Sequence, residues 1–290
     1  SPWTSEHIKW LVDTGERIST VDGKKVKVLE LCHKKDEVVL SAWARHFRNH
    51  YCLDSEIDYW RRGYKYSPQE YLNTIKFPSP KDAPGPSIRS GDFGEVLVAD
   101  YLEYLLGYWV PRTRYGDKTI RNESTKGSDI IGFHIVKDGK ASLKDRLAIF
   151  EAKAQFSGNK AKARLQDAVD GSAKDIARKA ESLNAIKQKL YGRNELDNAE
   201  KIERFQNEVD HPYKEVYGAV ALSESDESRD QGGLRPADQG ALYSGSQEYG
   251  GGNRARYLRP LEDRRAGIGR ERGGDRHGPQ DHLRGGYLRR

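Results

Sequence analysis

The chain has 290 residues, of which 36% are hydrophobic, and this is enough to build a folded core. Its apolar runs are short and interrupted, far below the roughly 20 residues that a transmembrane helix needs, so no membrane protein is expected. Most of the net charge of +6 arises in residues 231–290, which hold 12 Arg and 7 Asp or Glu; residues 1–230 hold 38 basic and 37 acidic side chains. The nearly neutral main part of the chain therefore argues against a constitutive, high-affinity nucleic-acid binder.

The N-terminus lacks the basic start and apolar stretch of a secretory signal. The two cysteines, Cys32 and Cys52, belong to no CxxC motif and have no paired histidines nearby, so they do not predict a zinc site. We expect a cytoplasmic protein with free thiols.

Residues 1–85 predict a small α+β region, with a strand over 25–31 and a helix over 37–51. Four prolines between residues 78 and 86 predict an irregular break and a domain boundary. No carboxylate spacing typical of a metal site occurs before this break. We therefore expect residues 1–85 to serve chiefly as a partner interface.

A second region, residues 86–222, predicts a nuclease-like α/β domain. A helix is expected from Ser90-Gly91-Asp92 to about residue 106, followed by strands over 108–115, 130–136 and 147–154. Polar helices over 160–190 and 194–209 and a strand over 215–222 complete the order. This order indicates an α/β fold with a mixed sheet flanked by helices.

From residue 223 the composition changes to a Gly/Arg-rich tail without Lys, Val or Phe after residue 230. One interpretation is a disordered segment that binds nucleic acid. The other is a coding sequence that leaves its natural frame near residue 223. Neither interpretation supplies a core, so we expect residues 223–290 to lie outside the compact fold.

The chemistry is expected at the end of the strand around Glu151. Because side chains alternate along a strand, Glu151, Lys153 and Gln155 project from one face. Asp129 stands at the head of the neighbouring apolar strand, and pairing of the two strands could bring its carboxylate to Glu151. Two close carboxylates, with the carbonyl of Ala152, suit Mg²⁺ or Mn²⁺, and we expect Glu95, on the helix before Asp129, to join them as a metal ligand and catalytic residue.

Such a metal site would hydrolyse a phosphodiester, with Lys153 orienting water or stabilising the transition state and Gln155 contacting the water or DNA. The alternative for a bare D…ExK match is an exposed ladder of charges in which Asp129 only caps a turn. The preceding helix, which carries Glu95, favours the catalytic interpretation, because helix, strand and strand in this order form the restriction-endonuclease-like core of PD-(D/E)xK nucleases. Gly127-Ser128-Asp129 stands where that family often has Pro-Asp.

Basic residues crowd the approach to Asp129, and they predict phosphate contacts; the alternative is a solvated loop. They are Arg112, Arg114, Lys118, Arg121 and Lys126. His46 and His50 lie four residues apart on the predicted helix but lack a third metal ligand.

Long contiguous segments carry a closer resemblance: residues 46–51, 75–78, 84–95, 108–115 and 122–129. Over residues 1–222 the chain resembles the HamA family, the nuclease subunits of the Hachiman anti-phage defence system, whereas the tail does not. The resemblance implies a DNA nuclease that a partner helicase, HamB, holds inactive until infection.

Two other functions remain open. A catalytically inactive relative could bind nucleic acid without cutting it, and a regulatory subunit of a helicase complex could serve as an interaction module. The intact Asp129, Glu151 and Lys153 favour an active enzyme, because a pure binder need not keep this set.

Overall fold

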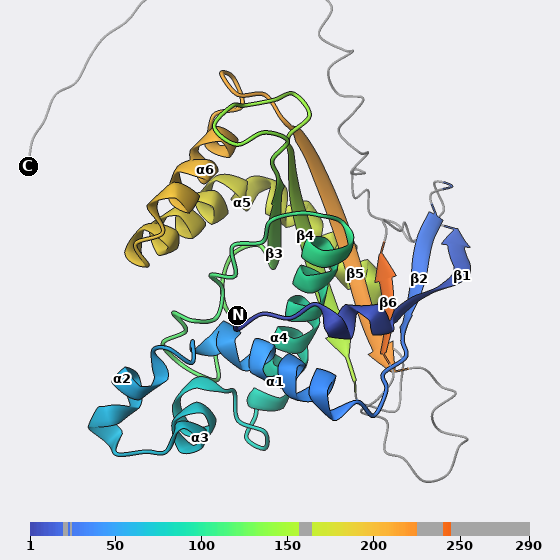
Figure 1. Ribbon diagram of the computed structural model, residues 1–290. Helices are drawn as coiled ribbons and strands as arrows, with labels where there is room; N and C mark the ends of the chain where they lie inside the picture. Colours follow the sequence, from blue (N-terminus) through green and yellow to red (C-terminus); the bar gives the residue numbers. More distant parts are fainter. Residues whose placement is uncertain (20–22, 24, 157–163, 225–239, 245–290) are drawn as a thin grey trace, which may run out of the picture.

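The computed structural model describes residues 1–19, 23, 25–156, 164–224 and 240–244. Its centre is a six-stranded sheet in the order β1-β2-β6-β5-β4-β3 (Figure 1). Strands β4 and β5 run parallel, and the other neighbouring pairs run antiparallel. This confirms the mixed sheet. The strands are β1 (Leu11–Ser19), β2 (Lys25–Leu31), β3 (Ile130–His134), β4 (Arg146–Gln155), β5 (Lys214–Glu224) and β6 (Gly240–Ser244).

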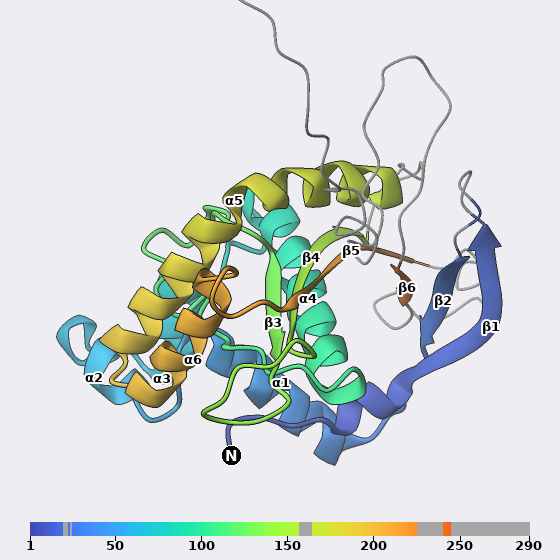
Figure 2. The same cartoon turned by 90° about the horizontal axis from the view of Figure 1, so that it is seen from above.

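Helices cover both faces of the central strands (Figure 2). Along β4, Ala148, Phe150 and Ala152 pack in the core that includes helix α4 (Gly85–Asp100), whereas Leu147 and Ile149 pack with α5 (Arg164–Gly192) and α6 (Leu196–Gln206). This alternation is the period-2 pattern of a strand buried on both faces. It also places Glu151 and Lys153 on the α5 face.

The N-terminal region is mainly helical. The 3₁₀ turn η1 (Glu6–Trp10) precedes β1, and α1 (Glu37–Tyr51) begins where the Asp36 side chain accepts the N–H groups of Val38 and Val39 at 3.1 Å. The remaining short elements are α2 (Ile57–Arg61), η2 (Arg62–Tyr64), α3 (Pro68–Tyr71) and the π-helical turn η3 (Leu72–Lys76). A second π-helical turn, η4 (Tyr101–Leu105), continues α4.

Helix α4 lies close to the sheet at Gly94. A Cβ at this position would lie 3.1 Å from the Cβ of Ala154 and 3.2 Å from a methyl group of Leu222, so the residue lets the helix approach β4 and β5 closely. Glu95 follows directly, and the close approach therefore fixes its distance from the strands.

Two predicted elements differ from the structure. The helix expected from Ser90 already begins at Gly85, because Pro86 fits the first turn, where its missing N–H has no partner to lose. The strand expected over 108–115 forms a single bridge between Trp109 and Phe133. Pro111 lacks an N–H for a ladder, and Arg112 takes a left-handed φ of 50°, so an extended strand ends there.

The expected boundary near residue 85 does not separate two cores. Ile8, Trp10 and Leu29 belong to the same hydrophobic cluster as Leu97 and Phe150. The tail expected outside the fold also differs from the structure, since residues 240–244 form β6 between β2 and β5. An apolar Ala-Leu-Tyr stretch at 241–243 is the sequence signal for this strand. The rest of the tail after residue 224 lies outside the described residues.

Within the described ranges, no helix combines the length and apolar character needed to cross a bilayer. Cys32 and Cys52 are free thiols, as expected.

Candidate active site

Asp129, Glu151 and Lys153 lie together at the end of the sheet. Pairing of Ile130 with Phe150 places Asp129, the residue before β3, opposite Glu151 of β4. Lys153 donates a hydrogen bond to the Glu151 carboxylate, and its Nζ lies 3.9 Å from Oδ2 of Asp129. The Glu151 side chain is 11% exposed and that of Lys153 is 35% exposed. The carboxylates of Asp129 and Glu151 are therefore largely desolvated, whereas the Lys153 side chain is partly open to solvent.

The backbone of Ala152 also faces Asp129. Its N–H donates to Asp129 Oδ2 at 3.2 Å. Because the N–H and C=O of one strand residue point toward the same neighbour, the Ala152 carbonyl lies on the Asp129 side of β4. Gln155, the last residue of β4, is half-buried, pairs in register with Ser223 of β5 and lies two residues beyond Lys153.

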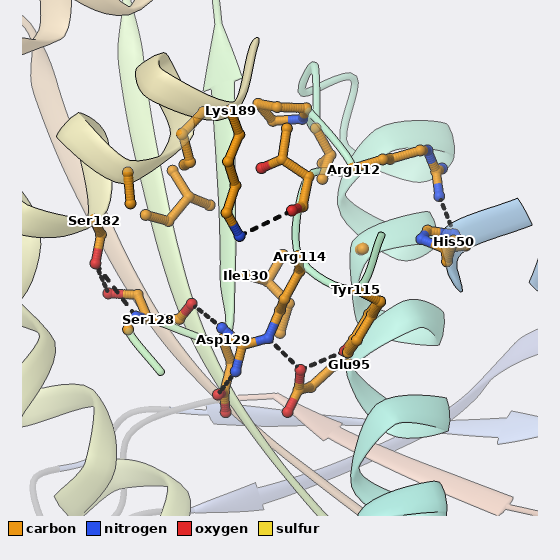
Figure 3. A pocket seen from close by; sticks show the side chains of 18 of the residues that line it. His50, Glu95, Arg112, Arg114, Tyr115, Ser128, Asp129, Ile130, Ser182 and Lys189 are labelled. Atoms are coloured by element: carbon orange, nitrogen blue, oxygen red, sulfur yellow. Dashed lines mark hydrogen bonds and ion pairs between the residues drawn. The ribbon is translucent and has the colours of Figure 1, made fainter. Parts of the chain in front are cut away.

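Arg114 bridges Glu95 and Asp129 (Figure 3). Its Nε donates to Oε2 of Glu95 at 2.6 Å, and its Nη2 donates to Oδ1 of Asp129 at 2.8 Å. The same guanidinium donates to the carbonyl of Ser128 at 2.6 Å, and Tyr115 donates a hydrogen bond to Glu95. The contact holds Asp129 by one oxygen and leaves the other oxygen toward β4.

The carboxylates of the site resist joint ionisation. Burial raises the pKa of Glu95 to about 7; the charge of Arg114 opposes this rise, and that of Asp129 adds to it. Burial and the charge of Asp129 raise the pKa of Glu151 to about 8, although Lys153 opposes the rise. A cation bound between the carboxylates would relieve this repulsion.

The donor set of Asp129, Glu151 and the Ala152 carbonyl fits a hard divalent cation such as Mg²⁺ or Mn²⁺, which prefers oxygen ligands. The two carboxylates already converge on one positive charge, the Lys153 ammonium. Glu95 does not join them as predicted, because the guanidinium of Arg114 lies between it and Asp129. We therefore place Glu95 beside the candidate metal ligands rather than among them.

Gly171 of α5 lies against the Glu151 side chain, which occupies the position that a Cβ would need. A Cβ at Gly171 would lie 2.5 Å from Oε1 of Glu151, well inside van der Waals contact. No local pattern in the sequence pointed to this residue. A glycine in the middle of a long helix is a weak signal, although it usually has a packing reason because it costs about 1 kcal/mol relative to alanine.

The five predicted phosphate contacts do not form one basic surface. Three of them turn inward: Arg112 toward Asp100 and Glu103, Arg114 toward the site, and Lys118 toward Asp92 at 3.1 Å. Burial explains the difference, because a buried cation needs a carboxylate partner. Arg121 is half-buried and donates to the carbonyl of Asn73 at 2.7 Å, whereas Lys126 is exposed at the rim of a cavity.

That cavity, of about 280 Å³, opens beside the carboxylates (Figure 3). It lies between α4, the segment 110–115, the start of β3 and the C-terminal half of α5. Glu95, Arg114 and Asp129 form one end, and Lys189 projects into it from α5. Figure 3 also shows the hydroxyls of Ser128 and Ser182, 3.2 Å apart, on the α5 side.

A second polar cluster lies buried behind the segment 111–115, and the sequence analysis did not find it. Asp100 accepts hydrogen bonds from His7 at 2.9 Å, from His46 at 3.0 Å and from Arg112 at 2.7 Å. Burial alone would raise the pKa of Asp100, but the two histidines and the charge of Arg112 hold it well below its usual range. Arg112 also donates to His50 at 2.8 Å.

His7, His46 and Asp100 form the one group of three His, Cys, Asp or Glu side chains, among the described residues, whose ligand atoms all lie within 4.8 Å. The hydrogen bonds argue against a metal there. Nδ1 of His46 accepts the backbone N–H of Thr4 at 3.1 Å, so the neutral ring carries its proton on Nε2 and donates it to Asp100. A metal at Nε2 would require the opposite tautomer, and Arg112 would add an adjacent positive charge.

These elements define an α/β protein with a carboxylate–lysine site at the end of a mixed sheet. The family model described as HamA matches residues 6–249 of the chain. The chain therefore belongs to the HamA family and is a component of Hachiman anti-phage defence. The match extends past residue 222, where the resemblance seen in the sequence ended, and it includes β6. Neither a curated protein nor a solved structure matches the chain.

Proposed function

We propose that the chain is a metal-dependent deoxyribonuclease whose site consists of Asp129, Glu151 and Lys153. The observation that carries the proposal is the convergence of the Asp129 and Glu151 carboxylates, from paired segments of the sheet, on the ammonium group of the partly exposed Lys153. We propose that the chain acts on DNA in the cytoplasm, where a component of anti-phage defence would meet foreign DNA.

Asp129, Glu151 and the Ala152 carbonyl would hold Mg²⁺ or Mn²⁺. When bound, such an ion polarises the phosphodiester and makes water a stronger nucleophile near neutral pH. Lys153, whose side chain is partly exposed, would bind a phosphate oxygen and stabilise the charge that develops in the transition state. Arg114 binds one oxygen of Asp129, and the other oxygen accepts the backbone N–H of Ala152 on β4. Gln155 remains a candidate contact for the water or the strand.

Incubation of plasmid DNA and of linear single-stranded DNA with the purified chain tests this proposal. Cleavage in Mg²⁺ or Mn²⁺ that EDTA abolishes is expected. DNA that is bound but never cut, with either metal and with or without the partner helicase, would instead support the inactive binding subunit.

A first prediction concerns Gly171. Alanine at this position should lower the cleavage rate at least about tenfold, because its Cβ displaces the Glu151 carboxylate. The free energy of unfolding should stay equal or rise, since alanine favours a helix over glycine by about 1 kcal/mol. Rates on plasmid DNA and denaturant unfolding measure the two effects.

Gly91→Ala in α4 is the matched control, because a Cβ there would meet nothing within 4 Å. It should keep full activity. A Gly171→Ala variant as active as Gly91→Ala would show that the Glu151 position is not critical.

We further propose that a partner helicase contacts the N-terminal region through an exposed aromatic surface, formed by Tyr59, Trp60 and Tyr64. Their exposed fractions are 66%, 51% and 55%. The guanidinium of Arg62 lies 5.5 Å from the Tyr59 ring centre. Tyrosine, tryptophan and arginine are the residues that most often dominate protein interfaces. Free solvent exposure of this set is consistent with a protein partner.

Tyr59→Ser with Trp60→Ser should weaken helicase binding at least about 30-fold, since the loss of even one aromatic anchor costs about 2 kcal/mol or more. Tyr191→Ser on α5, where the tyrosine is 70% exposed, is the control and should bind normally. Calorimetry with the helicase measures the affinities, and Mn²⁺ titration checks that the metal site is unchanged. Equal helicase affinity in both variants would place the interface elsewhere.

A further inference from the structure

Lys189 carries a positive charge into the cavity without a carboxylate partner in the described part of the chain. Its Nζ donates to the carbonyl of Thr113 at 3.1 Å, and no Asp or Glu lies within ion-pair distance among the described residues (Figure 3). Burial lowers the pKa of Lys189; nearby Asp117 opposes this effect, and Arg114 and Arg193 add to it. A half-buried ammonium in such surroundings is stabilised by an anionic ligand.

The other charged residues around the cavity do not neutralise Lys189. Arg112 and Arg114 are paired with buried carboxylates, and Arg193 donates to the carbonyl of Arg112 at 3.3 Å. Lys126 and Glu181 are exposed lining residues. Local positive charge therefore remains on the α5 side of the cavity, on the side opposite Asp129 and Glu95.

Part of the remaining lining is apolar. Val110 and Pro111 come from the segment before Arg112, Ile130 from β3, and Ala185 and Ile186 from α5. A polar end that carries the Lys189 ammonium group, and an apolar wall, suit a ligand that has a phosphate at one end and a flat, weakly polar ring at the other. The volume of about 280 Å³ is near the lower limit of about 300 Å³ for small-molecule pockets, so a single such unit fits and a base pair does not.

We propose that this cavity binds one unpaired nucleotide of a DNA strand, with its phosphate on Lys189 and its base against the apolar wall. The proposal rests on the nuclease function and specifies its substrate class: single-stranded DNA or a frayed strand end. A base inside an intact duplex would first have to leave the stack, at a cost of a few kcal/mol. The strand would then continue from the cavity toward Asp129 and Glu151.

The test measures binding of a 5′-phosphorylated single-stranded 12-mer, by fluorescence anisotropy, to protein made inactive by Glu151→Gln. In this background, Lys189→Gln should weaken binding about tenfold and reduce the slope of log K against log salt by about 0.7, the value for one lost phosphate contact on a single strand. Lys189→Arg should restore most of the affinity and most of the slope.

Lys187→Gln is the matched control, two residues away on α5, where Lys187 pairs with Glu203 on the surface. Its affinity and slope should match the background. Ala185→Phe narrows the cavity without changing charge, so it should weaken binding and leave the slope unchanged. This second variant decides the question if Lys189→Gln does not fold. A covalently closed duplex should bind at least tenfold more weakly than the 12-mer, and thymidine monophosphate should compete with the 12-mer.

Normal affinity and slope in Lys189→Gln, normal binding in Ala185→Phe, or equal binding of single strand and closed duplex would overturn the proposal. Failure of thymidine monophosphate to compete would also count against it. Any of these results together with metal-dependent cleavage by the wild type would leave the nuclease function in place. Loss of binding in Lys189→Gln without any cleavage by the wild type would keep the cavity and remove the nuclease function.

Discussion

Glu151→Gln and Lys153→Met should each lower the rate of DNA cleavage by at least about 10³-fold, because each removes charge stabilisation from a preorganised site. Folding should be preserved. The pKa of Glu151 is already raised by burial and by Asp129, so a neutral amide replaces a carboxylate that is costly to ionise. Cleavage rates and thermal unfolding of both variants measure these effects.

The two variants should differ in metal binding. Glu151→Gln removes a proposed ligand and should weaken Mn²⁺ binding, whereas Lys153→Met should bind Mn²⁺ at least as well as the wild type. Glu123→Gln and Lys140→Met, both at exposed positions, are the controls. Wild-type cleavage by either active-site variant would refute its assigned role.

Arg112→Met should lower the free energy of unfolding by about 3–5 kcal/mol, the usual cost of removing one partner of a buried ion pair. The Arg112 side chain is 6% exposed, and Asp100 is fully buried. Without the guanidinium, Asp100 keeps its two histidines but loses its one permanent cation. Arg112 also lies 5.0 Å from the ring centre of Trp3, so the N-terminal segment loses a contact as well.

Denaturant unfolding measures this loss, and Arg17→Met is the control. Arg17 pairs with Asp13 on the surface, where both side chains are more than a third exposed, and its loss should have little effect. Arg112→Met combined with Asp100→Asn should cost less than the sum of the single changes, because the two residues interact. Equal losses in Arg112→Met and Arg17→Met would show that the buried cluster contributes little.

The segment 112–115 connects the buried cluster with the candidate site. Arg112 reaches back to Asp100, and Arg114 reaches forward to Glu95 and Asp129. The carbonyl of Thr113 accepts from Lys189 of α5. The N-terminal region, α4 and α5 therefore all contact the segment that positions Asp129. Arg112, which contacts the N-terminal region, lies only two residues before Arg114, which contacts Asp129.

The strand pattern carried most of what the sequence could predict. Alternation along β4 placed Leu147 and Ile149 below Glu151 and Lys153 on one face, and the structure has the same arrangement. Asp129 could be predicted as a site residue because it directly precedes the apolar strand that begins at Ile130. Such local periodicity is set by backbone geometry and is therefore visible in the order of residues.

Long-range partners were not visible in that order. The sequence analysis assigned Arg114 to a phosphate and Arg112 to the same basic surface, because an arginine shows its charge but not its partner. In the structure the partners of Arg114 are 19 and 15 residues away, and His46 lies 66 residues from Arg112. Gly171 has the same explanation, since its role depends on the packing of α5 on β4.

The most direct measurement is the anomalous scattering of Mn²⁺ in crystals of the Glu95→Gln protein and of the wild type. We expect, in both, one strong peak coordinated by Asp129, Glu151 and the Ala152 carbonyl. A peak bound by His7, His46 and Asp100 instead, or loss of the site when Glu95 alone is changed, would contradict it.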